Sequence, residues 1–248
     1  MAILPHASPI AVGGVGGSGT RLIAGLLQSA GYWMGDRLNS TSDDLAFSES
    51  LVTEEAVDCS ESRFDELLLQ YLLHVMSAHR IAGLDALDVL SRWGWKEPNT
   101  HMHMHRIALR IPHVRYVHVM RSGLDMAFSA NQQQVKRWGE RLLGHPVDGS
   151  PRHSLRYWVL VHRRINANCM RLGARFLMLN YDRLCTNPDD ELPALLAFAG
   201  IDPSDATLER LRAMISPPDS IGRFRHHGLH VFDPGDVDYV RSLGFEVD

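Results

Sequence analysis

The sequence predicts a three-layer α/β fold in which a central, mainly parallel sheet is flanked by helices. Near the N-terminal end, an apolar run at 10–12 is followed by five glycines within 13–19 and then by apolar residues at helical spacing. Farther along, apolar runs alternate with segments of helical periodicity, as in chains of strand–helix units. The 248 residues, 45% of them hydrophobic, suffice for one α/β domain over 1–248.

The glycine-rich stretch 13–19 organises this predicted fold. It lies between the expected buried strand at 10–12 and a helix that begins near Ser18 and buries Leu22 to Ala30. A strand, a glycine loop and a helix in this order form a phosphate cradle, because bare backbone N–H groups and the helix dipole converge on an anion. We therefore expect a P-loop-like anion site, with an ordinary glycine-rich turn as the alternative.

The loop differs from that of proteins that bind nucleoside triphosphates. Counted from Gly14, the pattern G-x-x-x-x-G reaches Gly19, after which that motif continues with Lys and then Ser or Thr. Here Thr20 and Arg21 follow, so the lysine that contacts the β- and γ-phosphates is missing. The loop therefore predicts a different anionic donor.

The remaining elements are predicted in chain order from apolar periodicity. Strands are expected at 93–96, 114–120 and 175–179, with a short strand or turn at 31–35. Helices are expected at 64–79, 100–109, 124–138, 155–172 and 191–199, and from Ser204 to just before Pro217. Gly173 and Gly200 are expected to end two of them. Segments 36–50 and 144–152 are predicted loops, and the tail from Pro217 is expected to be irregular.

Composition restricts the environment and the partners of the chain. A net charge of −4 gives no overall attraction to nucleic acid or to an anionic membrane. The scattered Cys59, Cys169 and Cys185 are typical of reduced buried thiols in a reducing compartment. No stretch has the pattern of a signal peptide or approaches a membrane span, so we expect a soluble, cytoplasmic protein.

Five short motifs occur along the chain in an order that matches one known pattern. They are Gly16-Gly17-Ser18-Gly19-Thr20-Arg21, Trp93-Gly-Trp-Lys96-Glu97-Pro98, Arg121-Ser-Gly-Leu-Asp-Met-Ala-Phe-Ser129, Tyr181-Asp-Arg-Leu184 and Ser220-Ile-Gly-Arg223-Phe-Arg225. Together they resemble the sulfotransferase family, in its bacterial form with some motifs like those of tyrosylprotein sulfotransferases. The resemblance implies transfer of a sulfuryl group from 3′-phosphoadenylyl sulfate (PAPS) to a hydroxyl or amine. It also implies adenosine 3′,5′-bisphosphate as the product and an acceptor that is a small molecule or a glycan. Because the strand end after the loop carries no carboxylate, we expect no metal.

The resemblance also implies which residues bind the donor. They are Gly16, Gly17, Ser18, Gly19, Thr20, Arg21, Arg121, Ser129, Tyr181, Ser220, Arg223 and Arg225. A donor with a 5′-phosphosulfate and a 3′-phosphate needs two anion sites, and Arg121 with Ser129 on the following helix can supply the second. Arg223 and Arg225 alternate, so both would point the same way in an extended segment. The alternatives are an ion pair of Arg121 with Asp125 and a solvated basic tail.

The expected catalytic residues depart from the family pattern, because Gly17 occupies the position where the family usually has Lys or Arg. Lys96 in Lys96-Glu97-Pro98 resembles the Lys-Asp-Pro lysine of tyrosylprotein sulfotransferases and is the first substitute, with Arg21 the second. Transfer also needs a base for the acceptor proton. Asp36, in Met34-Gly35-Asp36, matches a glutamate of those enzymes and is the first choice. Asp43, Asp44 and Glu97 remain alternatives.

The sequence leaves two other function classes open, a nucleotide kinase and a nucleotide-binding protein without turnover. A nucleotide kinase is disfavoured by the missing loop lysine and by Arg121, where a Mg²⁺-binding Asp would be expected. A nucleotide-binding protein without turnover is suggested by Gly17. His101, His103 and His105 suggest a metal site on a helix, but no Glu or Cys pattern accompanies them, so we expect none.

Overall fold

The computed structural model describes residues 8–81 and 92–248. Within these residues a four-stranded sheet has the order β2-β1-β3-β4, and all three neighbouring pairs are parallel. The strands are β1 (Ile10–Gly14), β2 (Gly94–Lys96), β3 (Arg115–Met120) and β4 (Phe176–Asn180). The predicted α/β fold with a central parallel sheet is confirmed.

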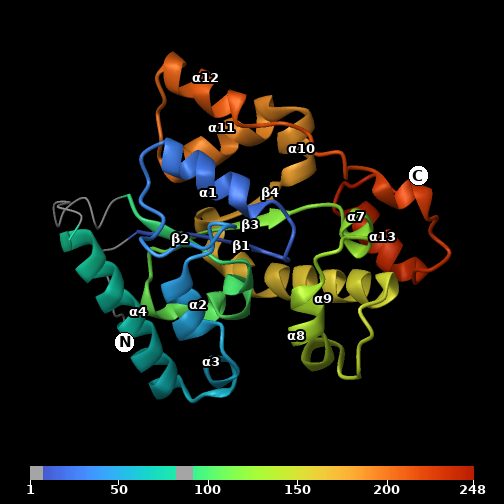
Figure 1. Ribbon diagram of the computed structural model, residues 1–248, viewed down its shortest axis with the longest axis horizontal. Helices are drawn as coiled ribbons and strands as arrows, with labels where there is room; N and C mark the ends of the chain where they lie inside the picture. Colours follow the sequence, from blue (N-terminus) through green and yellow to red (C-terminus); the bar gives the residue numbers. More distant parts are fainter. Residues whose placement is uncertain (1–7, 82–91) are drawn as a thin grey trace.

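Helices cover both faces of the sheet (Figure 1). One face carries α1 (Thr20–Ser29), α10 (Tyr181–Thr186), α11 (Pro188–Ala199) and α12 (Asp205–Ala213). The other carries α2 (Leu45–Leu51), α3 (Glu54–Asp58), α4 (Glu61–Ile81), α6 (Met104–Arg110), α8 (Gln133–Leu143) and α9 (Pro151–Cys169). The remaining elements are η1 (Pro98–Met102), α7 (Gly123–Ala127), η2 (Met170–Arg175), η3 (Arg223–His226) and α13 (Pro234–Ser242). No helix within 8–81 and 92–248 is long and apolar enough to cross a membrane.

The alternation of side chains along the strands builds two cores. Ile10, Val12 and Val117 pack with α1 and α11, whereas Ala11 and Tyr116 belong to the core on the opposite face. All five are fully buried. The sheet is therefore apolar on both faces, as expected for parallel strands covered by helices on each side.

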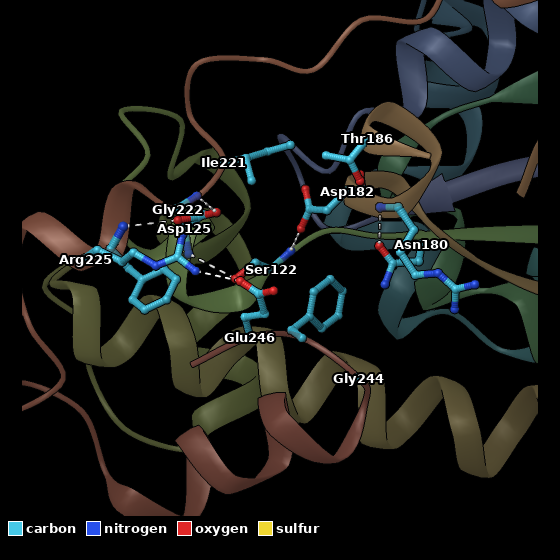
Figure 2. Close-up of a pocket in the computed structure, with 13 residues that line it drawn as sticks. Ser122, Asp125, Asn180, Asp182, Thr186, Ile221, Gly222, Arg225, Gly244 and Glu246 are labelled. Atoms are coloured by element: carbon cyan, nitrogen blue, oxygen red, sulfur yellow. Dashed lines mark hydrogen bonds and ion pairs between the residues drawn. The ribbon is translucent and has the colours of Figure 1, made fainter. Parts of the chain in front are cut away.

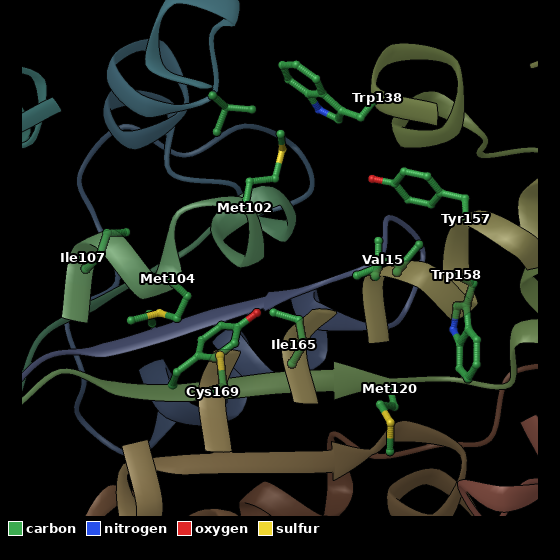
Figure 3. Close-up of a cluster of buried hydrophobic side chains, with 14 of the residues drawn as sticks. Val15, Met102, Met104, Ile107, Met120, Trp138, Tyr157, Trp158, Ile165 and Cys169 are labelled. Atoms are coloured by element: carbon green, nitrogen blue, oxygen red, sulfur yellow. The ribbon is translucent and has the colours of Figure 1, made fainter. Parts of the chain in front are cut away.

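The larger core reaches up to the glycine loop. Figure 3 shows Val15 of that loop together with Met102 of η1, Trp138 of α8, and Tyr157 and Trp158 of α9. Each of these side chains is at most 7% exposed, and burying one large apolar side chain stabilises a fold by roughly 1.5–3 kcal/mol. Packing of Val15 therefore fixes the loop on a rigid base.

Several predicted elements are confirmed in detail. The helix at 64–79 is α4, which buries Phe64, Leu68 and Tyr71 as the periodicity requires. Gly200 ends α11 with a φ of +67°, and Ser204 caps α12 by accepting the Thr207 N–H. The segment 31–35 pairs with the sheet through one isolated bridge.

Other boundaries differ from the prediction. The segment 124–138 is not one helix but α7 and α8, because the Gln132 side chain donates to the carbonyls of Met126, Ala127 and Ser129 at the end of α7. Ser129 therefore lies in the connection and not on a helix, contrary to prediction. The segment 100–109 divides into η1 and α6, and the helix at 155–172 ends earlier and passes into η2.

Two predicted irregular segments contain helices. The expected loop at 36–50 ends in α2, where the Asp44 carboxylate accepts the Phe47 N–H. The tail beyond Pro217 forms η3 and α13, and α13 begins with the Asp233 cap followed by Pro234. Both capping residues can be recognised in the sequence, but helices this short have too few apolar repeats to be predicted from periodicity.

Three histidines lie close together inside the larger core. They are His101 of η1, His118 of β3 and His162 of α9. The ring centroid of His118 lies 6.4 Å from that of His101 and 5.0 Å from that of His162. All are at most 4% exposed. Burial lowers the pKa of His101 to about 3 and that of His162 to about 4, and it lowers the pKa of His118 well below its usual range. All three are therefore neutral at pH 7.

This cluster predicts a steep loss of stability in mild acid. Because the folded-state pKa values lie below the unfolded value of about 6.5, the unfolded chain binds more protons and folding weakens as pH falls from there toward the folded values. Each such histidine adds a slope of roughly 1.4 kcal/mol per pH unit. Urea unfolding at pH 7.5, 6.5 and 5.5 measures how the free energy of unfolding depends on pH. The His101→Leu substitution should reduce this slope by about 1.4 kcal/mol per pH unit, the contribution of one proton. Equal stability at pH 7.5 and 5.5 would contradict the prediction.

Candidate functional site

The carboxyl ends of the four strands carry the predicted site residues. The glycine loop follows β1, Lys96 ends β2, Arg121 follows β3 and Tyr181 follows β4. The chain passes from β1 to β2 on one side and then to β3 on the other, so the strand order changes direction at β1. In open parallel sheets ligands bind at such a switch point, outside the carboxyl ends of the strands.

The loop leaves an uncapped helix N-terminus for an anion. The Ser18 N–H donates to the Val15 carbonyl at 3.0 Å, and Gly19 stands at the N-cap of α1 with no side chain to bond the first-turn N–H groups. The first turn of α1 holds no acidic residue. Ser18 is 1% exposed, and its Oγ has no hydrogen-bond partner among the described residues. Free N–H groups and a hydroxyl of this kind are the donors that a phosphate or sulfate group requires.

The two glycines at the tip of the loop have different requirements. Gly17 has a φ of +93°, but a Cβ there would meet only the Met126 Cε at 4.0 Å. Gly19 has a φ of +91°, and a Cβ there would overlap the aromatic ring of Tyr181. Gly19 is therefore required both for its backbone conformation and for the close approach of Tyr181.

We expect Gly19→Ala to disrupt the loop. The substitution adds left-handed strain of about 1–2 kcal/mol and forces Tyr181 away from α1. Thermal unfolding should show a lower melting temperature, and affinity for adenosine 3′,5′-bisphosphate should fall. Gly144→Ala is the matched control, since Gly144 has a φ of +78° with nothing within 4 Å of a Cβ. A loss of affinity no larger than that of the control would contradict a special role for Gly19.

Arg121 connects three parts of the site. Its guanidinium donates to the Ser220 hydroxyl and to the Gly17 carbonyl at 3.5 Å, and its Nε lies 3.6 Å from the Asp182 carboxylate. The guanidinium carbon lies 5.6 Å from the centre of the Tyr181 ring. The side chain therefore lies between the loop, α10 and the C-terminal tail, and the alternative of an Asp125 ion pair is wrong.

Two carboxylates, the buried Asp125 and the partly buried Asp182, support this arrangement (Figure 2). Asp125 accepts the backbone N–H groups of Gly222 at 2.8 Å and Phe224 at 3.1 Å, which fixes the tail segment that carries Ser220. Asp182 accepts the Ser122 N–H at 2.8 Å, and burial raises the pKa of its carboxyl. Both line a cavity of about 220 Å³. Sequence analysis considered Asp125 only as an ion-pair partner of Arg121 and did not single out Asp182, although Asp182 stands next to the predicted Tyr181.

The two tail arginines do not point the same way. Arg223 donates to the carbonyls of Ser220 at 3.3 Å and Phe128 at 3.4 Å. Arg225 instead pairs with Glu246 at 2.6 Å and donates to the Asp248 carbonyl. The segment forms the 3₁₀ helix η3 and not an extended strand, so the expected convergence is wrong.

Two other predicted donor contacts are not assembled in this structure. The Ser129 Oγ accepts the Asn131 N–H at 3.2 Å within its own turn. Arg21 is exposed in the first turn of α1, whereas Thr20 beside it is buried. Thr20, together with Ser18, therefore stays at the base of the loop, and Arg21 faces outward.

Lys96 is buried beside the loop strand. It pairs in register with Val12 of β1 and is 2% exposed. Its Nζ donates to the Thr41 carbonyl at 2.9 Å and forms an ion pair with Asp43. The Asn39 side chain accepts the Asp43 N–H at 2.9 Å, which fixes this segment over the lysine. Lys96 is therefore a positioned internal cation and not an exposed strand-end lysine.

Asp43, one of the four candidate bases, is paired with Lys96. The other three candidates have different partners. Asp44 accepts from the Tyr71 hydroxyl at 3.0 Å in addition to capping α2, and burial raises its pKa. Glu97 is buried and accepts from Asn99 at 2.9 Å, and burial raises its pKa to about 7. Asp36 lies 2.8 Å from the Nε2 of His74, and its side chain is 39% exposed.

His74 was not singled out from the sequence. It lies one turn of α4 beyond Tyr71, next to the buried face of that helix. This position was the sequence feature from which His74 could have been identified. The three histidines considered as metal ligands have different surroundings. The His101 ring lies 6.4 Å from that of His118, the His103 ring lies 5.3 Å from that of Phe64, and His105 is exposed. Within 8–81 and 92–248, no group of three or more His, Cys, Asp or Glu is arranged to hold a metal ion.

Comparisons with known proteins bear on the whole chain. A family model described as "Sulfotransferase family" matches residues 9–205. Among solved structures, the chain resembles the sulfotransferase domain from the Synechococcus PCC 7002 olefin synthase, with a TM-score of 0.58, 12% identity, and coverage of 98% of this chain and 97% of that one. It also resembles the sulfotransferase domain from the curacin biosynthetic pathway, with a TM-score of 0.54, 12% identity and coverage of 98% and 100%.

A third similar structure is the sulfotransferase STF9 from Mycobacterium avium. Its TM-score is 0.52 at 14% identity, with coverage of 84% of this chain and 68% of that one. At these identities the likeness concerns the fold alone. None of the curated proteins matches the chain.

Proposed function

This chain belongs to the sulfotransferase family, and from this premise we propose that it transfers a sulfuryl group from PAPS to a hydroxyl or amine. The acceptor class we propose is a glycan or a small hydroxylated metabolite. We also propose that residues 1–248 act as one domain. The packing of the C-terminal helix α13 against α9 and α7 supports this, since the last helix shares the core of the sheet.

The observation that carries the proposal is a pair of hydrogen-bond donor clusters at the carboxyl ends of the strands, each suited to an anion. The loop offers free N–H groups and the buried Ser18 hydroxyl, and Arg121 with Ser220 and Arg223 offers a second cluster of donors nearby. A donor with a phosphosulfate at one end and a 3′-phosphate on its ribose fits such a pair. Tyr181, packed on Gly19 between the two, would contact the nucleoside.

Transfer is a substitution at sulfur. PAPS, when bound, supplies the sulfuryl group and leaves as adenosine 3′,5′-bisphosphate. An S–O or S–N bond to the acceptor forms, and the bond from sulfur to the 5′-phosphate oxygen breaks, so the electron pair of that bond stays on the phosphate. Lys96 uses two of its three N–H donors on Thr41 and Asp43, and we propose that the third stabilises this charge.

Asp36 is the base that we propose for the acceptor proton. Asp43 is paired with Lys96, and Asp44 already accepts two hydrogen bonds. Glu97 follows Lys96 in extended backbone, so its side chain faces the opposite side of the sheet. The partly exposed Asp36 carboxylate can meet an acceptor hydroxyl while His74 orients it through their 2.8 Å contact.

Thermal shift with two ligands tests the proposal. Adenosine 3′,5′-bisphosphate should stabilise the protein, by about 2.7 kcal/mol at a hundredfold excess over its dissociation constant. ATP with Mg²⁺ should not. Stabilisation by ATP–Mg²⁺ alone would instead support phosphoryl transfer, the main alternative.

Turnover requires a separate assay. Radiolabelled sulfate should move from PAPS to members of a panel of glycans and small hydroxylated acceptors. The transfer should continue after EDTA treatment, because the proposed machinery consists of N–H donors, Lys96 and Asp36. Binding of the bisphosphate without transfer to any acceptor would favour a nucleotide-binding protein without turnover.

A further inference from the structure

A second cavity, lined by three arginines, lies between the α3–α4 connection, α6, α8 and α9. Its volume is about 420 Å³, within the range of small-molecule sites, and its polar lining includes Glu61, His103, His105, Arg106, Arg141 and Arg164. We propose that this cavity binds a hydroxyl-bearing phosphate or sulfate monoester of about the size of a sugar phosphate. Such a ligand is recognised by a free guanidinium and a neutral imidazole on adjacent walls.

The three arginines of this cavity differ in how much of their charge and how many of their N–H donors remain available to a ligand. Arg106 is engaged by Glu61 at 3.0 Å and by the carbonyls of Ala56 and Ser60, so it serves mainly to hold the wall together. Arg141 has both of its terminal nitrogens on the Asp58 carboxylate. The charge of each is therefore largely compensated within the protein.

Arg164 is the cation available to a ligand. It donates to the Met102 carbonyl at 3.2 Å, and no carboxylate of the described residues lies within ion-pair distance of it. A guanidinium has five N–H donors in a fixed fork, which matches two oxygens of a phosphate or sulfate. Arg164 is half-buried, so a bound anion would be screened less than at an open surface.

His103 supplies the complementary recognition of a hydroxyl. It lines the cavity and is 2% exposed, and its Nε2 has no hydrogen-bond partner among the residues that the structure describes. Burial and the charge of Arg106 lower its pKa to about 4. The ring is therefore neutral at pH 7 and suits a hydroxyl better than a second anionic oxygen.

The cavity is distinct from the donor loop. Gln134 of α8 donates to the Gly14 carbonyl at the loop, whereas Arg141 follows seven residues later on the same helix. At 1.5 Å per residue this is about 10 Å along the axis. Trp138 is buried between them. An anion in the cavity therefore does not occupy the loop.

Isothermal titration with glucose 6-phosphate tests the proposal. The wild type should bind it, and Arg164→Gln should weaken binding about tenfold or more. Arg121→Ala, a change in the proposed donor site that does not touch the lining of this cavity, should leave binding unchanged. Arg163→Gln is the matched control on the same helix, since Arg163 instead lies over the Tyr239 ring at 4.8 Å. Arg164→Lys and the melting temperatures show whether a loss reflects the site or the fold.

Two further probes identify the ligand chemistry. Glucose should not bind, because it lacks the anion, and inorganic phosphate should bind more weakly than glucose 6-phosphate, because it lacks the hydroxyls. Glucose 6-sulfate should bind with an affinity similar to that of the phosphate ester. Equal binding of inorganic phosphate, equal effects of Arg163→Gln and Arg164→Gln, or a loss only in Arg121→Ala would overturn the proposal.

Discussion

Replacing Lys96 with methionine is expected to lower the rate of sulfuryl transfer about 10²–10³-fold, the typical effect of removing one fixed donor at a developing charge. Affinity for adenosine 3′,5′-bisphosphate should change little, because the proposed contact strengthens only as charge builds on the leaving phosphate. Methionine preserves most of the buried stem of this side chain, which is 3% exposed. Single-turnover rates and equilibrium titration separate the two effects.

The chain offers a matched control for this substitution. Lys136 is the only other lysine, and it is exposed on α8. Lys136→Met should therefore leave both rate and affinity unchanged. Because Lys96→Met leaves Asp43 without its cation, the Lys96→Met/Asp43→Asn double variant tests whether a lost rate comes from the unpaired carboxylate. Unchanged turnover in Lys96→Met would reject the assignment and move attention to Arg21.

Restoring the cation from the loop is a more demanding experiment. Gly17 has room for a side chain, since only the Met126 Cε lies near the position of a Cβ. Its φ of +93° makes any other residue there strained by about 1–2 kcal/mol. Gly17→Lys in the Lys96→Met background should thus regain part of the rate at some cost in stability.

The sequence predicts long-range architecture better than local detail in this protein. The run 114–120 and the helix at 64–79 are recognisable because many apolar residues repeat at one period, and they appear as β3 and α4. The break between α7 and α8 depends on one side chain, Gln132, turning back to bond three carbonyls. Periodicity carries no information about such a bond, so the break was missed.

The same distinction applies to the candidate site. The glycine loop, Lys96 and Arg121 follow strands, and parallel strands bring their carboxyl ends to one edge whatever the details. The partners of these residues depend on tertiary contacts between segments far apart in the chain. Asp43 lies 53 residues from Lys96, and Asp182 lies 61 residues after Arg121. Neither pairing has a local signal.

Replacing Arg121 with alanine is expected to weaken binding of adenosine 3′,5′-bisphosphate about ten- to hundredfold. The lost charge-assisted hydrogen bonds are worth about 1.5–3 kcal/mol. Affinity for adenosine 5′-phosphate, which lacks the 3′-phosphate, should change far less. Titration of both nucleotides against the wild type and the variant gives the comparison directly. We expect a selective loss because the Arg121 guanidinium donates to Ser220 and to the Gly17 carbonyl, whereas the 5′-phosphate is proposed to bind the N–H groups of the loop.

The Arg121 experiment must separate recognition of the 3′-phosphate from support of the fold. Arg121 also faces the partly buried Asp182, so Arg121→Ala leaves a carboxylate without its cation. Arg121→Gln keeps hydrogen-bond donors for Asp182 and Ser220 while removing the charge, and it should show the same selectivity with a smaller change in melting temperature. Arg212→Ala, an exposed arginine paired with Asp189 on the surface, controls for the change in net charge. Equal losses for both nucleotides would mean that Arg121 does not read the 3′-phosphate, and that its role is to hold Gly17, Ser220 and α10 together.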